Sequence, residues 1–274
     1  MPVGRLAYPR LATLGLAILL PAVAAFAGDI PTGPEIMDAV AARHDRPFEA
    51  TVGEMTLTDA GGRETRRLIR GFARREADGG SRHMLTFVGP PAIAGVAMLA
   101  WDHPGGRTDQ WLFLPAAGEP TRVLGGARRG FFLDTDFALE DFLVDRRERH
   151  RQDRVADADD RGVPCYVVEI RPSDPEVAAA SGYRLKRVFV GRADHLVRRV
   201  EYFDRDTGRH VKTMLLLEVA EPSPGTLRPR AYRMENHRDR HASAITITGW
   251  DFTEAAVPLE MFAPRWLAAR RHMR

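Results

Sequence analysis

Short runs that mix apolar and polar residues, separated by Gly, Pro or Asp turns, fill the first half of the chain. Runs of this kind are typical of β-strands that bury one face. Their connections are too short for the crossover that parallel strands need, so we predict antiparallel pairing. The predicted strands of this half are Thr51–Thr58, Glu64–Arg74, Arg82–Val88, Val96–Trp101 and Asp109–Leu114.

The second half shows the same pattern after a charged stretch, Arg146–Arg161, which is predicted as a polar strand or a surface loop. The total of about eleven strands indicates a mainly β (α+β) fold, and an open antiparallel sheet of that size usually curls. We find no internal repeat and no low-complexity linker, which favours a single domain over residues 28–274. The later predicted strands are Cys165–Ile170, Arg184–Val190, Leu196–Asp204, His210–Val219, Arg230–Asn236 and Ala244–Phe252.

Three segments have helical spacing instead. Pro34–His44 reads as a short helix with Thr32 as its cap, and Leu259–Arg270 reads as a terminal helix. Between the two sets of strands, Phe131–Val144 places aromatic residues close to helical spacing, with Asp134 or Asp136 able to accept backbone hydrogen bonds at the helix start. We expect this segment to form a short helix that lies across the sheet as a lid.

The N-terminus has the three-part layout of a secretory signal peptide, with two arginines, an apolar run over 11–26 and small residues before Gly28. We therefore predict cleavage of residues 1–27 and a periplasmic mature protein. Position 28 is not the Cys of a lipoprotein, and the single cysteine, Cys165, excludes an internal disulfide. The fold must therefore be held together by its core.

The charge of the chain is mixed and nearly balanced. Its 40 basic and 37 acidic residues give a formal net charge of +3, and acidic residues interleave the arginines almost everywhere. Lysine occurs only at Lys186 and Lys212. This pattern favours a solvated surface over a phosphate-binding patch, so we expect no nucleic-acid partner.

Candidate reactive groups each have a simpler structural interpretation. The acidic group Asp134, Asp136, Glu140 and Asp141 has the ligand type that divalent cations prefer, but helix capping and solvent exposure are favoured. His237 and His241 lie too far apart on an extended strand to share a metal. Cys165 sits in an apolar run, as a buried core cysteine does. No nucleophile elbow or phosphate loop is present, so we predict a protein that is not an enzyme, with no cofactor and no metal.

Large apolar and aromatic residues remain as the candidate binding surface. A single sheet with few helices has too little cover for one whole face, so a ligand or partner must help to bury it. We expect Trp111 and Phe113 to line the inner face of the sheet, and Phe137 and Phe142 to sit on the lid above it. The full candidate set is Phe87, Met98, Trp101, Trp111, Phe113, Phe131, Phe132, Phe137, Phe142, Leu215, Leu217 and Trp250.

The order and spacing of several motifs resemble the LolA-like periplasmic outer-membrane lipoprotein-sorting proteins. The motifs are Leu85-Thr-Phe87 with Pro90 or Pro91 and Gly95, Trp111-Leu-Phe-Leu-Pro115, Thr135-Asp136-Phe137 with Glu140-Asp141, Arg199-Val-Glu-Tyr-Phe-Asp204, Pro229 and the tract from Trp250 to Phe262. The resemblance covers nearly all of the mature chain. It implies a half-barrel of eleven strands with short helices over its concave face. The best-known members latch the lid with an arginine, and no arginine is assigned to that role here.

The resemblance implies a soluble periplasmic carrier or acceptor that binds acyl chains of a lipid or lipoprotein and helps to move it between the inner and outer membranes. The related branch is associated with exporters of the resistance-nodulation-division or MMPL type, which makes such an exporter a candidate partner. A second hypothesis is a periplasmic sensor of the same fold that binds a membrane-protein partner. A third is an envelope hydrolase with an unfamiliar motif, for which Asp136 or Ser181 would be the residues to test.

Overall fold

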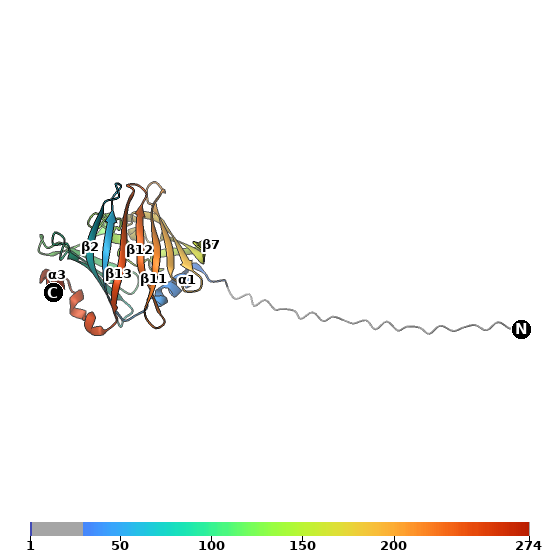
Figure 1. Ribbon diagram of the computed structural model, residues 1–274, viewed down its shortest axis with the longest axis horizontal. Helices are drawn as coiled ribbons and strands as arrows, with labels where there is room; N and C mark the ends of the chain where they lie inside the picture. Colours follow the sequence, from blue (N-terminus) through green and yellow to red (C-terminus); the bar gives the residue numbers. More distant parts are fainter. Residues whose placement is uncertain (2–29, 274) are drawn as a thin grey trace. The chain divides into compact units, whose positions relative to one another are not determined.

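A single antiparallel sheet of thirteen strands forms the body of the protein (Figure 1). The computed structural model describes residue 1 and residues 30–273, so the predicted signal peptide, residues 1–27, lies almost entirely outside the described residues. No described helix is long and apolar enough to cross a membrane. The strands are β1 (Phe48–Thr58), β2 (Glu64–Arg75), β3 (Ser81–Gly89), β4 (Ala97–Asp102), β5 (Thr108–Phe113), β6 (Pro120–Arg122), β7 (His150–Asp160), β8 (Val163–Pro172), β9 (Tyr183–Gly191), β10 (Val197–Asp204), β11 (His210–Ser223), β12 (Thr226–Asn236) and β13 (His241–Asp251).

The strand order is β6-β5-β4-β3-β2-β1-β13-β12-β11-β10-β9-β8-β7, so the first and last strands of the chain pair in the middle of the sheet. Each half is a meander of neighbouring hairpins. The two halves run outward to opposite ends, which leaves β6 and β7 as the outermost strands although they follow each other in sequence. The connection between them, residues 123–149, must therefore cross the whole sheet.

The mainly β fold and all eleven predicted strands are confirmed, with boundaries that shift by a few residues. The structure adds β6 and β7 at the two ends. The charged stretch Arg146–Arg161, for which a strand and a loop were both open, contains strand β7 paired with β8. The exposed polar residues of β7 suit an outer strand, because such residues discourage pairing with another chain.

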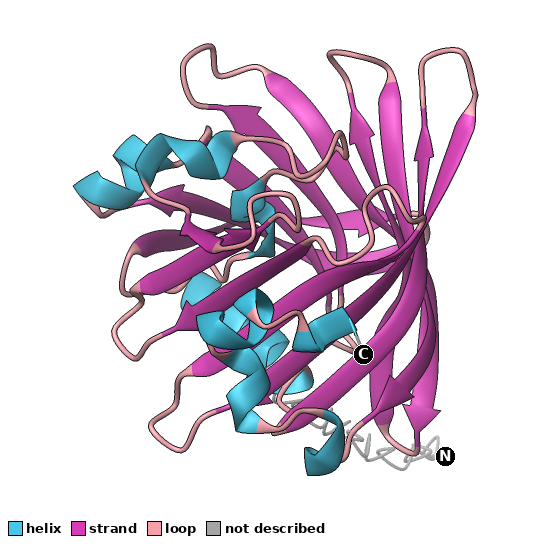
Figure 2. Ribbon diagram, turned by 90° about the vertical axis from the view of Figure 1, so that its left-hand side faces the viewer, coloured by secondary structure: helices cyan, strands magenta, loops and turns pink. Residues whose placement is uncertain are grey.

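The helices are short (Figure 2). Helix α1 (Gly33–Arg43) is close to its prediction, and the Thr32 side chain accepts a hydrogen bond from Glu35 N as its cap. The predicted terminal helix Leu259–Arg270 is instead broken into the 3₁₀ turn η4 (Leu259–Phe262) and α3 (Pro264–Ala268), since Pro264 lacks an N–H and begins a new helix. The remaining pieces are α2 (Pro175–Ala180), which the sequence pattern did not reveal, and the 3₁₀ turns η1 (Gly125–Arg129), η2 (Leu139–Phe142), η3 (Glu254–Ala256) and η5 (Arg271–Met273).

The sheet is strongly curved. Phe87 of β3 and Ile170 of β8 belong to one core cluster, although eight strand spacings separate these strands in the sheet. At about 4.8 Å per spacing they would be nearly 40 Å apart on a flat sheet. The face that carries this cluster, called the inner face below, is therefore concave.

Candidate functional site

The lid of the inner face is the segment Phe131–Asp145, and it is not the predicted helix. Phe131 forms an isolated bridge with Ala138, and Phe132 N donates to Phe137 O at 2.8 Å, so the chain turns back on itself. Leu133 and Asp134 have positive φ angles of 49° and 59°, which a right-handed helix does not allow. The predicted helix is wrong, and only the turn η2 has helical character.

Sheet residues hold the lid through its backbone. The guanidinium of Arg67, on β2, donates to Leu133 O, and Gln110 Nε2, on β5, donates to Leu139 O at 2.8 Å. Both side chains are buried. Arg67 is thus an arginine that holds the lid in this structure, and the sequence had not indicated it.

Asp134 and Asp136 do not cap a helix start, and Glu140 and Asp141 are not exposed to solvent, so both predictions for the lid acids are wrong. Asp136 instead accepts hydrogen bonds from Ser243 Oγ and His241 Nδ1, both at 2.7 Å. Asp141 accepts from Ala138 N at 2.7 Å and pairs with Lys212 of β11. The group that resembled a cation site is thus divided among separate partners, and no group of three potential metal ligands occurs within residues 30–273.

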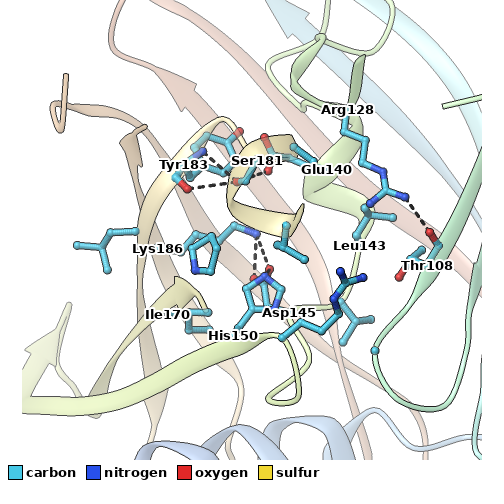
Figure 3. Close-up of a pocket in the computed structure, with 17 residues that line it drawn as sticks. Thr108, Arg128, Glu140, Leu143, Asp145, His150, Ile170, Ser181, Tyr183 and Lys186 are labelled. Carbon is cyan, nitrogen blue, oxygen red and sulfur yellow. Dashed lines mark hydrogen bonds and ion pairs between the residues drawn. The ribbon is translucent and has the colours of Figure 1, made fainter. Parts of the chain in front are cut away.

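A buried cluster of ionisable groups joins the end of the lid to β9 and β11, and Figure 3 shows its members Glu140, Asp145 and Lys186. Lys186 Nζ lies 2.9 Å from both oxygens of Asp145. Glu140 accepts from Ser181 Oγ and Gly182 N, each at 2.7 Å. The only two lysines of the chain therefore both serve to hold the lid.

Burial shifts the pKa values of this cluster in different directions. Desolvation raises the pKa of Glu140, although Lys186 opposes the shift. Desolvation also lowers the pKa of Lys212, and attraction to Asp141 only partly offsets it. For Lys186, desolvation is outweighed by Asp145 and the neighbouring acids, so its pKa is raised. Burial of Glu140 and Lys212 therefore takes charge out of water at a cost that their partners return only in part, whereas the acids around Lys186 more than compensate its burial.

Two adjoining cavities remain beneath and beside the lid. The larger, about 660 Å³, lies between α1, the lid and the inner face of β8 to β11. The smaller, about 230 Å³, lies over β2 to β4. Both are lined by Glu49, Ala73 and His83, so they form one groove. The apolar side chains that line the larger cavity are Met37, Val40, Leu143, Val144, Ile170, Val188, Val197, Val200, Tyr202 and Met214.

Some of the predicted binding residues do lie on the inner face. Phe87, Met98, Phe132 and Phe137 are buried in its core cluster, and Phe142 and Trp250 pack against that cluster. Within this set, Met98 and Phe142 line the smaller cavity. The aromatic residues of the lid and β3 thus meet beneath the lid.

The other predicted residues lie elsewhere. Trp101, Trp111 and Phe113 belong to a cluster on the opposite, outer face, where Trp101 Nε1 donates to Phe262 O at 2.7 Å. The expectation that Trp111 and Phe113 face the lid is therefore wrong, because the C-terminal segment Val257–Leu267 covers them. Phe131 and Leu217 are half exposed, and Leu215 is outside both clusters.

Sequence reasoning missed most residues that line the larger cavity. Met37 and Val40 lie within the predicted helix Pro34–His44 but were not among the candidate residues, and they line the cavity from α1. Val200, Tyr202 and Met214 lie on predicted strands. The missed signal was alternation in the second-half strands, since Val200 and Tyr202 are two residues apart and share a face.

The remaining reactive groups serve structural roles. His237 Nε2 and His210 Nε2 both contact Thr213 Oγ1, at 2.8 and 2.9 Å, whereas His241 turns away to Asp136. Cys165 is fully buried, and desolvation raises the pKa of its thiol. Ser181 Oγ donates to the buried carboxylate of Glu140 and accepts from Tyr183 N.

Ser81, His83 and Asp102 meet beside the groove, but not as a catalytic relay. His83 Nε2 lies 2.9 Å from Ser81 Oγ and 3.3 Å from Asp102 Oδ2. A relay needs the serine and the carboxylate on different ring nitrogens. Here one nitrogen makes both contacts, so the cluster does not have the geometry that activates a serine.

Three solved structures share the fold of this chain over most of its length. An outer membrane lipoprotein-sorting protein domain from Vibrio parahaemolyticus is 25% identical, with a TM-score of 0.78 over 86% of this chain and 98% of that one. A DUF1329-family protein from Desulfovibrio piger is 19% identical, with a TM-score of 0.74 over 84% and 98%. A LolA-superfamily protein from Nitrosomonas europaea is 17% identical, with a TM-score of 0.67 over 86% and 100%.

A search of curated proteins finds no match. A family model whose description reads "uncharacterized protein" matches residues 79–269, which is more than half of the chain. That region contains the lid and eleven of the thirteen strands, β3 to β13, whereas α1, β1 and β2 lie before it. The chain therefore belongs to this family, and it has the fold of the outer membrane lipoprotein-sorting protein domain and of the LolA-superfamily protein.

Proposed function

We propose that this protein is a periplasmic carrier or acceptor that holds acyl chains in the groove under the lid and helps to move a lipid or lipoprotein between the two membranes. The observation that carries the proposal is the pair of adjoining cavities on an apolar, concave sheet face. The secretion signal predicted over residues 1–27 supports the periplasmic location. A resistance-nodulation-division or MMPL-type exporter would be a suitable donor.

The energetics require a gated groove. Burying a methylene is worth about 0.8 kcal/mol, so a sixteen-carbon chain represents a gross gain of roughly 12 kcal/mol. Release at a useful rate requires that part of this gain be offset. Closing the lid desolvates Glu140 and Lys212, whose charged forms are disfavoured by burial, and this cost opposes the gain from binding the chain.

The test is uptake of a fluorescent fatty acid by the purified mature protein. Met214→Trp places a large ring on the floor of the larger cavity, so we expect affinity to fall about tenfold or more, which corresponds to about 1.4 kcal/mol. Leu217→Trp makes a comparable change at a half-exposed position of the same strand and should leave affinity unchanged. Native mass spectrometry checks whether lipid co-purifies.

Absence of bound lipid together with absence of fatty-acid uptake would rule out the carrier function. Capture of a membrane protein's periplasmic segment by such a lipid-free protein would favour the sensor hypothesis instead. Equal affinities for the two tryptophan variants would place the binding site outside the groove.

A further inference from the structure

The size of the groove limits the number of chains it can hold. A methylene occupies about the volume of a liquid water molecule, roughly 30 Å³, so a sixteen-carbon chain needs roughly 480 Å³. The two cavities, about 660 and 230 Å³, together have room for roughly 30 carbons, which is enough for two chains of about fifteen carbons each. Three chains would need roughly 1,400 Å³, which exceeds the space present.

Charged residues line the larger cavity, and most of them are neutralised by ion pairs. Arg75 pairs with Asp45, Arg147 with Asp38 at 2.8 Å, and Lys186 with Asp145. Among the other lining carboxylates, Glu49 pairs with Arg228 and Asp141 with Lys212. Glu148 makes no ion pair with a described residue, but it is exposed.

Arg146 differs from these residues. Its side chain is half-buried, and it makes neither an ion pair nor a hydrogen bond within the part of the chain that the structure describes. Its Nε is buried and has no partner there. The nearby carboxylate of Asp102 lies beyond ion-pair distance and is already bonded to Thr108 and His83. A buried guanidinium without an acceptor is costly, and oxygens of a phosphate or carboxylate would remove that cost.

We infer that the groove is built for a two-chain anionic lipid whose phosphate is bound by Arg146. The inference rests on the proposed acyl-chain function and goes beyond it by naming the cargo. The chains lie along the inner face under α1 and the lid, and the headgroup stays at the rim. A triacylated lipoprotein anchor has one chain too many for the space present, and a zwitterionic lipid offers Arg146 less net negative charge.

The experiment measures lipid uptake from vesicles. The mature protein is incubated with phosphatidylglycerol or phosphatidylcholine vesicles and re-isolated, and bound phosphate is counted per protein. We expect about one phosphatidylglycerol per protein and at least fivefold less phosphatidylcholine. Arg146→Gln should lower phosphatidylglycerol uptake about fivefold and leave binding of the neutral probe N-phenyl-1-naphthylamine unchanged.

Arg63→Gln is the matched control, because it removes the same charge at an exposed turn that does not line the groove. It should retain uptake of both lipids. Equal uptake of the two lipids, or no effect of Arg146→Gln, would overturn the inference. So would a synthetic triacylated lipopeptide that displaces the probe more strongly than phosphatidylglycerol does. If neither the neutral probe nor a fatty acid binds at all, the proposed function itself fails.

Discussion

Both faces of the sheet around β3 to β5 are covered by a segment from elsewhere in the chain, and the two covers differ in chemistry. On the outer face, the C-terminal segment inserts Val257, Phe262 and Leu267, which are all fully buried. On the inner face, the lid is held by Arg67, Gln110 and buried ion pairs, and it leaves cavities beside it. An apolar cover that fills its site is structural, whereas a polar cover over empty apolar space is suited to opening.

The largest expected effect of a single substitution is on the outer cover. Phe262→Ala removes a fully buried ring from a filled cluster, so the free energy of unfolding should fall by about 3–5 kcal/mol. Urea denaturation followed by circular dichroism measures the loss. Phe142→Ala on the lid is the matched change, and it should cost less than about 3 kcal/mol because Phe142 is half-buried and borders a cavity. Equal losses would remove the distinction between the two covers.

The strands could be predicted from the sequence because alternation and turn residues are local signals. Strand β6, with three residues, is too short to show a period. The faces could not be assigned in the same way. Strand β4 reads Ala-Met-Leu-Ala-Trp, apolar on both sides, because the lid covers one face and the C-terminal segment covers the other. Which side Trp101 occupies depends on a contact with Phe262, 161 residues away in sequence.

The lid segment was wrongly predicted to be a helix, for a related reason. Phe137 and Phe142 have nearly helical spacing, but they converge because the bridge between Phe131 and Ala138 folds the chain back. Asp136 looked like a cap because the sequence did not show that Ser243 and His241 lie opposite it. Residues over 100 positions apart decide these roles. The apolar character of the site could therefore be predicted from the sequence, whereas the polar residues that hold the lid in place could not.

The second prediction concerns the lid anchor Lys212. Lys212→Met leaves Asp141 buried without its partner, a change that costs about 3–5 kcal/mol when the site stays closed. The lid can instead detach and return Asp141 to water, so we expect a loss of at most about 3 kcal/mol. Hydrogen exchange should become faster in residues 131–145 and stay unchanged in the C-terminal cover.

The control for this prediction is Arg63→Gln, which breaks an exposed pair with Asp59 and should cost less than about 1 kcal/mol. Unchanged exchange of the lid in Lys212→Met would show that the ion pair does not hold it closed. Faster exchange throughout the sheet would show that the lid and the core unfold together, which would contradict the proposed gate.

The smallest expected effect is a pH dependence that arises from Glu140. Its pKa is raised in the folded state because burial disfavours the charged form, so the folded protein takes up this proton at a higher pH than the unfolded chain does. Stability contributed by Glu140 therefore increases as pH falls from the raised folded pKa toward 4.5, the ordinary pKa of a glutamate, and is constant outside that window. Glu140→Gln should remove this slope and change the free energy of unfolding at neutral pH by less than about 1 kcal/mol, since the amide keeps partners in Ser181 and Gly182.

Urea denaturation of the unsubstituted protein and of Glu140→Gln at several pH values between 4.5 and 7 gives the difference between their free energies of unfolding. The other acids are present in both proteins, so their contributions cancel in this difference. A difference that stays constant over this range would mean that Glu140 titrates normally and is not desolvated by the lid. A difference that changes in the opposite direction would mean that Lys186 and the hydrogen bonds from Ser181 and Gly182 outweigh burial. Closing the lid would then be favourable at Glu140, and the groove would lack one of the terms that allow it to release its cargo.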